Sequence, residues 1–208
     1  MKDIVIIGTG GHGREAVDII DAMNSVKNQY RIIGLIDDGK KKGSTARPHS
    51  HKILGTIEDL KHMDVGIIPA IGHPKTRQTI VQKLPHHVPV DAVHPTATIG
   101  SHVTTGPGLM LAAGARITHS VQVGSHVHLN VNSTVSHDCS LGNFVTITPG
   151  VNISGGVKLG DRVWVGVGAA IIQSVHVGDD VTIGAGAAVI RDAPDNTTQV
   201  GVPAHEVT

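Results

Sequence analysis

A repeat of six residues dominates the second half of the chain. From Val93 to Pro194 the sequence divides into 17 consecutive hexads, 102 residues without an insertion or a slip. The first position of each hexad is Val, Ile or Leu in every case but Thr105, and the fifth is nearly always small or β-branched. A short period kept over this length indicates a solenoid, whose units bury their apolar faces only by stacking on neighbours.

Each hexad reads as a short β-strand followed by a corner. The first and fifth side chains would point into the core, and Gly, Asn, Asp and His near the corner would tolerate its unusual backbone angles. Three hexads would make one turn of 18 residues, with successive turns stacked about 4.8 Å apart, like strands in a sheet. A β-sandwich is disfavoured, because its strands recur every 8–12 residues or so with irregular loops.

The composition narrows the possible functions. Lys plus Arg and Asp plus Glu are balanced at 17 each, and the only aromatic residues are Tyr30, Phe144 and Trp164, so nucleic-acid binding is not expected. No apolar run of membrane-spanning length and no signal peptide are visible, which predicts a cytoplasmic protein. The single cysteine, Cys139, suits a reducing compartment. Its place at the fifth position of a hexad predicts core filler rather than a nucleophile.

The N-terminal segment combines a strand, a glycine-rich turn and a helix. An apolar strand over residues 3–7 leads into Gly8-Thr9-Gly10-Gly11-His12-Gly13 and a helix from about Arg14 to Met23. Glycines let a ligand approach the backbone, and the N-terminus of a helix favours an anion. The alternative is a tight turn that needs glycine for packing only.

Further strands and helices complete a small parallel α/β unit. Strands are expected over residues 31–36, 66–71 and 88–93, with helices over 56–60 and 75–84 and a basic loop over 40–50. The second strand ends in Asp37-Asp38, where carboxylates can bind a nucleoside. This is about half of a dinucleotide-binding fold, so NAD is disfavoured. The expected division is an α/β nucleotide-sugar-binding domain over 1–92, the solenoid over 93–194 and a tail over 195–208.

The densest polar cluster in the solenoid comprises Asn130, Asn132, His137 and Asp138. One turn of 18 residues after His137 comes Gly155, whose N–H would lie about one strand spacing from the imidazole. A histidine base, a carboxylate and an uncovered N–H are the parts needed for acyl transfer. The alternative, a polar corner without a role, stays equally open, because the chain has 15 histidines.

Five motifs carry a resemblance to a known family, and the resemblance covers the chain from about residue 3 to about residue 204. They are IIGTGGHGREAVDII, GLIDD, the AIG of IPAIGHP, the HDC of VSHDCSLG, and VWVGVGA. The chain resembles the bacterial hexapeptide-repeat sugar O/N-acyltransferases, which include sialic acid O-acetyltransferases and UDP-4-amino-sugar N-acetyltransferases. The resemblance implies a Rossmann-like unit followed by a left-handed parallel β-helix, and a homotrimer with active sites between adjacent solenoids. It also implies acetyl-CoA as donor, a UDP-amino sugar as acceptor and no metal.

The resemblance also implies roles for individual residues. His137 matches the general base, Asp138 its neighbouring carboxylate, and Gly155 the amide that binds the thioester oxygen. The positions that match substrate contacts are Gly10, Gly11 and His12 for the diphosphate, Asp37 and Asp38 for the uridine, Gly72 in the AIG motif, and Asn130 near the acceptor sugar. The positions that match the CoA site are Thr146, Val167 and Ala185. Two departures are Thr146, where many relatives have histidine, and His205, where Lys or Arg is usual.

Three alternatives remain open on the sequence. One is O-acetylation of a sialic-acid-type sugar; the glycine-rich turn and GLIDD favour a nucleotide-linked acceptor, and hence N-acetylation. Another is a γ-type carbonic anhydrase, with zinc held between subunits of the same solenoid. The third is a non-catalytic nucleotide-sugar-binding trimer.

Overall fold

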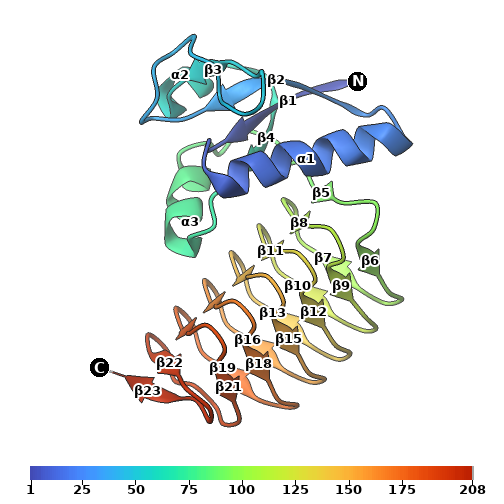
Figure 1. Ribbon diagram of the computed structural model, residues 1–208, viewed down its shortest axis with the longest axis vertical. Helices are drawn as coiled ribbons and strands as arrows, with labels where there is room; N and C mark the ends of the chain where they lie inside the picture. Colours follow the sequence, from blue (N-terminus) through green and yellow to red (C-terminus); the bar gives the residue numbers. More distant parts are fainter. Residues whose placement is uncertain (208) are drawn as a thin grey trace. The chain divides into compact units, whose positions relative to one another are not determined.

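The computed structural model describes residues 1–207 and divides them into two compact units, residues 1–93 and the described chain from residue 94 onward. The first unit is a four-stranded parallel sheet with helices (Figure 1). Its strand order is β3-β2-β1-β4. Its elements are β1 (Lys2–Ile7), α1 (Gly11–Val26), β2 (Tyr30–Ile36), β3 (Ile53–Gly55), α2 (Ile57–Leu60), β4 (Gly66–Pro69), α3 (Pro74–Gln82) and β5 (Ala92–Val93).

Aliphatic side chains from the strands and helices form the core of this unit. Val5, Ile7, Ile36, Leu60 and Ile67 are all at most 2% exposed and pack in one cluster. Full burial of such a side chain is worth about 1.5–3 kcal/mol, so the near-continuous apolar runs of β1 and β4 suit a parallel sheet that is covered on both faces.

Local signals place the helices within a few residues of their expected bounds. α2 begins with a capping box, in which Thr56 and Asp59 each bind the other's backbone N–H. α3 begins at Pro74, preceded by His73, whose Nδ1 accepts from the N–H of Thr76. The last expected strand is shorter than predicted, because only Ala92–Val93 is strand, and β3 was not predicted at all.

The second unit is a parallel β-helix with three faces, so the fold class predicted from the sequence is confirmed. Face 1 contains β6 (Thr98–Ile99), β9 (Arg116–Ile117), β12 (Thr134–Val135), β15 (Asn152–Ile153), β18 (Ala170–Ile171) and β21 (Ala188–Val189). Face 2 contains β7 (Thr104–Thr105), β10 (Gln122–Val123), β13 (Ser140–Leu141), β16 (Lys158–Leu159) and β19 (His176–Val177). Face 3 contains β8 (Met110–Leu111), β11 (His128–Leu129), β14 (Thr146–Ile147), β17 (Trp164–Val165) and β20 (Thr182–Ile183).

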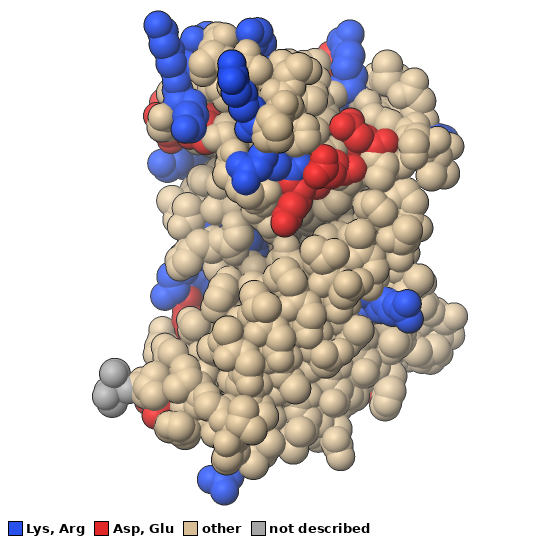
Figure 2. Space-filling model, in the orientation of Figure 1, with Lys and Arg blue, Asp and Glu red and all other residues tan. Residues whose placement is uncertain are grey.

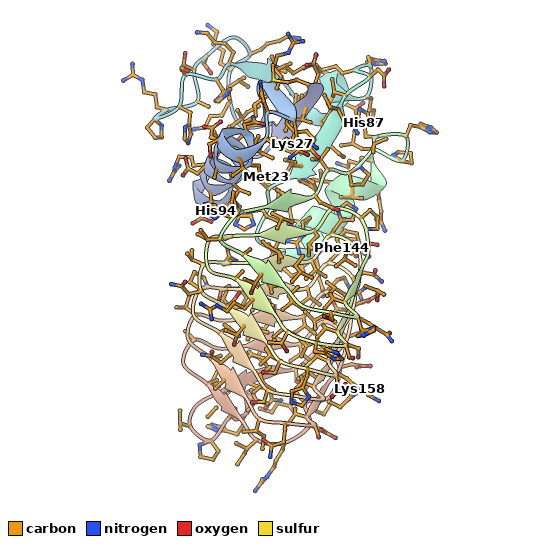
Figure 3. The ribbon with its side chains drawn as sticks, turned by 90° about the vertical axis from the view of Figure 1, so that its right-hand side faces the viewer. Met23, Lys27, His87, His94, Phe144 and Lys158 are labelled. Carbon is orange, nitrogen blue, oxygen red and sulfur yellow. The ribbon has the colours of Figure 1, made fainter. Side chains whose placement is uncertain are left out.

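Strands on one face pair in register at steps of 18 residues. Thr134 pairs with Asn152, and Ser140 pairs with Lys158. Each strand consists of the last residue of one hexad and the first residue of the next. The residue that begins a hexad is the second residue of its strand; it points inward and is buried from Leu111 onward. The residue before it, such as Lys158, points outward (Figure 3).

The backbone conformation at the corners explains which residue types occupy the fourth position of the hexads. From His102 to Gly186 this position has a positive φ throughout, between 55° and 77°. Only glycine adopts this region freely, and Asn and Asp tolerate it better than most residues. The corner at Asp138 is one of these, with φ of 60°, and this conformation sets the direction of its side chain.

The chain beyond residue 194 does not leave the β-helix. β22 (Thr198–Val200) pairs in parallel with β20 on face 3, and β23 (His205–Val207) pairs antiparallel with β22. The antiparallel strand therefore ends the stack of parallel strands. Among residues 1–207, no helix is both long enough and apolar enough to span a bilayer.

Candidate active site

His137 and Asp138 lie at the corner between β12 and β13, and both side chains are about two-thirds exposed (65% and 67%). Nδ1 of His137 is 2.8 Å from Oδ2 of Asp138. A carboxylate that accepts the Nδ1 proton holds the ring in the tautomer whose Nε2 carries the free lone pair. The pair therefore has the arrangement of a general base facing solvent.

The imidazole of His137 lies against Gly155, one turn further along the β-helix. A Cβ at Gly155 would stand 2.6 Å from Cε1 and 2.8 Å from Nε2 of His137, closer than the 3.0 Å that real Cβ atoms respect. The carbonyl of Gly155 accepts from Ser174, but its N–H donates in no hydrogen bond found among residues 1–207. Glycine thus leaves both the ring and the N–H uncovered, and such an N–H can stabilise a developing oxyanion.

An open depression of about 520 Å³ is lined by His137 and Asp138 and by residues of the next two turns. Four of its lining residues were not singled out from the sequence: Ser154, Gly156, Gln173 and Ser174. The 18-residue step could have found them, since residue 173 is two turns beyond His137 and residue 155 is one. The depression extends from His137 toward the C-terminal turns.

The predicted cluster of Asn130, Asn132, His137 and Asp138 is not formed within one chain. Asn130 and Asn132 lie at the corner between faces 3 and 1, whereas His137 lies at the corner between faces 1 and 2. Strand β12 separates the two corners. Asn130 is 6% exposed, and its Nδ2 donates to the carbonyl of Ile147 at 3.0 Å. This hydrogen bond joins two neighbouring turns of the β-helix, and Asn130 does not lie beside the imidazole of the same chain.

Two of the three residues predicted to bind CoA share the corner of Asn130. Val167 and Ala185 lie between faces 3 and 1, and Val167 is 53% exposed. The adjacent glycines Gly168 and Gly186 have positive φ and nothing within 4 Å of a Cβ position. We call this corner the glycine edge and the corner of His137 the His137 edge. A thin ligand could lie along the glycine edge and bond to backbone groups.

Thr146 differs from the other two residues predicted to bind CoA. It is on face 3 rather than at an edge, and only 1% of it is exposed. Its contact with CoA therefore has less support in the structure than those of Val167 and Ala185.

The glycines of the N-terminal turn fall into two kinds. Gly8 has φ of +104°, and a Cβ on Gly13 would lie 2.1 Å from the carbonyl oxygen of Gly8, so the fold requires both. Gly10 has nothing within 4 Å of a Cβ, and Gly11 has only one guanidinium nitrogen at 3.9 Å. Gly72 is likewise open. The fold does not require these three glycines for packing, so the space over them is sterically open to a ligand.

Helix α1 begins at this open surface. Its N-cap, Gly10, offers no side-chain cap, and its first turn carries no acidic residue. His12 points Nδ1 toward Glu15 at 3.4 Å, and this hydrogen bond is the main reason that the pKa of the Glu15 carboxyl is lowered. No acidic side chain in the first turn therefore neutralises the helix dipole, which favours an anion at the N-terminus of α1.

Asp37 and Asp38 border a small apolar slot of about 160 Å³, with Ile57, Ile71 and Ile80 among its walls. Asp37 accepts hydrogen bonds from the backbone and the hydroxyl of Thr9 and, at 2.9 Å, from the N–H of Gly39. Asp38 accepts from the N–H of Ile57 at 2.8 Å. Both carboxylates therefore shape the slot, and each retains lone pairs for a further donor. A flat, largely apolar group with polar edges, such as a nucleobase, suits this slot.

Comparisons with known proteins agree with both units. Residues 3–84 match the PglD N-terminal domain family. A curated relative, the UDP-N-acetylbacillosamine N-acetyltransferase of Bacillus subtilis (strain 168), is 28% identical over 123 residues. That alignment covers 54% of this chain and 52% of the relative, so it spans about half of the relative's length.

Solved structures match nearly the whole chain. The acetyltransferase domain of PglB from Neisseria gonorrhoeae FA1090, in complex with acetyl coenzyme A, is 28% identical, with a TM-score of 0.89 over 99% of both chains. PerB from Caulobacter crescentus, in complex with CoA and GDP-perosamine, is 29% identical, with a TM-score of 0.88 over 100% of this chain and 98% of that one. WeeI from Acinetobacter baumannii AYE is 26% identical, with a TM-score of 0.88 over 100% of both chains. The N-terminal unit thus matches the PglD N-terminal domain family, and the fold of the whole chain is similar to that of acetyltransferases of known structure.

Proposed function

We propose that this chain transfers an acetyl group from acetyl-CoA to the amino group of a UDP-linked 4-amino sugar. The observation that carries the proposal is the His137–Asp138 pair lying against Gly155, whose N–H donates no hydrogen bond found among residues 1–207, on a fold shared with acetyltransferases. Relatives whose names specify UDP- and GDP-linked sugars support the acceptor class.

The chain's own residues supply three functions for this reaction. Nε2 of His137 takes a proton from the attacking amine, and Asp138 stabilises the imidazolium that forms. The N–H of Gly155 donates to the thioester oxygen as negative charge develops there, while the amine nitrogen bonds to the carbonyl carbon and the CoA thiolate leaves. General-base catalysis is typically worth about 10²–10⁴-fold, and an oxyanion-hole donor about 3–4 kcal/mol.

The nucleotide part of the acceptor would bind to the N-terminal unit. The slot beside Asp37 and Asp38 would hold the base and the ribose, and the open backbone at Gly10 and Gly11 would hold the diphosphate. Gly72 would border the same ligand. Each assignment follows the open backbone or the carboxylate contacts described above.

The assembly that fits these positions is a homotrimer. The His137 edge and the glycine edge of one β-helix are separated by face 1, whereas acetyl transfer requires the base and the CoA arm at one place. Two chains side by side would bring the His137 edge of one to Asn130, Val167 and Ala185 on the glycine edge of the next. A cyclic arrangement of three makes three such sites.

The test is a thiol-release assay with acetyl-CoA and a panel of acceptors. UDP-4-amino sugars should release CoA at the highest kcat/KM, a GDP-4-amino sugar should be slower, and free sialic acid should give the uncatalysed background rate. Turnover with sialic acid alone would replace the proposal with sugar O-acetylation. Absence of turnover with every acceptor, despite CoA binding, would favour a non-catalytic binding protein.

The zinc alternative requires ligands from two subunits, so a metal assay on the purified protein tests it. Among residues 1–207, no group of three or more His, Cys, Asp or Glu side chains is arranged to hold a metal ion. Zinc present in one equivalent per chain in the purified protein, and required for activity, would reopen that alternative.

A further inference from the structure

A basic depression lies on the helix side of the glycine-rich turn. Its volume is about 310 Å³, and its lining includes Arg14 from α1 and Lys40 and Arg47 from the loop between β2 and β3, together with the hydroxyl residues Thr9, Ser44 and Thr45. No carboxylate lines it. Cations gather over the N-terminal unit more generally, since 13 of the chain's 17 Lys and Arg residues fall in residues 1–93 (Figure 2).

Arg14 connects this depression to the open glycines. Its Nη2 is 3.9 Å from the position that a Cβ of Gly11 would occupy. An anion resting on the bare backbone at the start of α1 would therefore lie beside the guanidinium. Thr9 joins the depression to the opposite slot, because it donates to Asp37 through both its N–H and its hydroxyl.

The three cations that line the depression form no ion pair found among residues 1–207. Three other charged side chains near the depression have polar partners of their own. Lys42, in the same loop, pairs with Asp59 at 3.2 Å, and Asp18 on α1 lies 3.9 Å from His49. Glu15 is bound to His12. An excess of unpaired positive charge in a concave site is complementary to phosphate, and arginine recognises phosphate with paired hydrogen bonds.

We infer that Arg14, Lys40 and Arg47 form a phosphate subsite that extends the Gly10–Gly11 anion site, and that they make the protein select nucleoside diphosphates over less charged nucleosides. This inference rests on the proposed function, which places a nucleotide-linked sugar in the N-terminal unit. The diphosphate group carries two phosphates, of which the start of α1 binds one and the three cations bind the other. Lys40 and Arg47 thereby become specificity residues for the acceptor.

The experiment compares full-length variants by titration calorimetry, with UDP, GDP and uridine as probes. Arg47→Ala and Lys40→Ala should each weaken binding of UDP about tenfold, as expected for the loss of a charge-assisted hydrogen bond, and leave uridine affinity unchanged. Lys42→Ala is the matched control. It removes an equal charge from the same loop but outside the depression, and UDP affinity should stay within about twofold. Raising the salt concentration should weaken UDP binding to the wild type more than to Arg47→Ala.

Several outcomes would overturn the inference. One is UDP affinity unchanged in both variants while the wild type binds UDP. Another is an equal loss for UDP and uridine, which would indicate a structural role for the loop. If CoA binding falls instead of UDP binding, the depression serves the donor. A wild-type protein that binds neither UDP nor GDP would overturn the proposed acceptor class as well.

Discussion

The imidazole of His137 occupies the space that a side chain at Gly155 would fill: a Cβ there would stand 2.6 Å from Cε1 of the ring. The two residues are 18 positions apart, one full turn of the β-helix, and the peptide N–H of Gly156 donates to the carbonyl of His137 at 2.8 Å. The turn spacing thus places the imidazole of His137 against the backbone of Gly155. The proposed base and the proposed oxyanion donor therefore depend on one contact.

Gly155→Ala tests that contact. The added methyl group would displace the ring and cover the N–H, although the backbone of Gly155 is not in the left-handed region, so the fold should tolerate alanine. Turnover should fall at least about a hundredfold, since one oxyanion donor alone is worth about 10²–10³. The measurement is kcat by thiol release, with the melting temperature as the control for folding. Wild-type kcat in a folded Gly155→Ala protein would rule out this geometry as the reaction centre.

His137→Ala should lower turnover at least about a hundredfold while UDP affinity is unchanged, because the base acts only on the reacting amine. His119→Ala is the matched control. His119 lies one turn earlier on the same edge, and its ring packs edge-on to His102 at 5.0 Å between centroids, outside the depression. It should keep most of its activity. Equal losses in the two variants would mean that the corner, rather than the His137 base, is being disturbed.

The glycines of the N-terminal turn should separate into two classes on mutation. Gly13→Ala would force a methyl group to within 2.1 Å of the carbonyl oxygen of Gly8, so it should lower the melting temperature. Gly10→Ala meets nothing within 4 Å and should melt like the wild type, but bind UDP more weakly because the methyl group occupies the ligand's surface. Thermal unfolding and calorimetry measure the two effects. A stable Gly13→Ala protein, or unaltered UDP binding by Gly10→Ala, would contradict the division.

The β-helix was readable from the sequence because its geometry is periodic. Position 1 of the hexad must point inward, so an aliphatic residue at every sixth position, such as Leu129 or Val135, predicts the core of the β-helix. The same arithmetic brought Gly155 to His137. Within one chain it also separates His137 from Asn130 and Asn132, because residues one hexad apart lie at different corners and only residues a multiple of 18 apart share an edge.

The N-terminal unit was less readable because its details depend on tertiary contacts. Gly10 and Gly13 are both glycines of the same turn, and the sequence does not distinguish them. Their roles differ because the carbonyl oxygen of Gly8 lies against Gly13 and not against Gly10. β3 is three residues long and follows a polar loop, so no pattern marks it. The bond from Thr9 to Asp37 joins residues 28 apart, and nothing local predicts it.

Cys139 should be unreactive in the folded protein. The residue is 2% exposed, its Sγ donates to the carbonyl of Ser154 at 3.1 Å, and burial raises the pKa of the thiol. Since the thiolate is the reactive form, a raised pKa leaves little of it at pH 8. Titration with a disulfide reagent should find no rapidly reacting thiol in the native protein and one after denaturation, which matches the single cysteine of the sequence. Rapid native labelling with loss of activity would show that Cys139 is accessible beside the proposed catalytic pair.

Arg162 should stabilise the late turns of the β-helix by neutralising a column of carboxylates. Its Nε and Nη2 donate to the two carboxylate oxygens of Asp180, both at 2.9 Å, and Asp161 and Asp179 flank it at 3.6 and 3.7 Å. The hydrogen bond to Asp180 is the main reason that the pKa of Arg162 is raised, so the guanidinium is charged at every pH of interest. Arg162→Ala leaves three carboxylates facing one another.

The loss should be about 1.5–3 kcal/mol of unfolding free energy at pH 7, the range for hydrogen bonds to charged groups. It should shrink when salt is raised to about 1 M, because salt screens the repulsion among carboxylates that are partly exposed. Urea unfolding at low and high salt measures the difference. Arg116→Ala, which removes an exposed arginine from face 1, is the control and should cost less than about 0.5 kcal/mol. An Arg162→Ala deficit that is as large at high salt as at low salt would show that the residue stabilises the turns through packing rather than through charge.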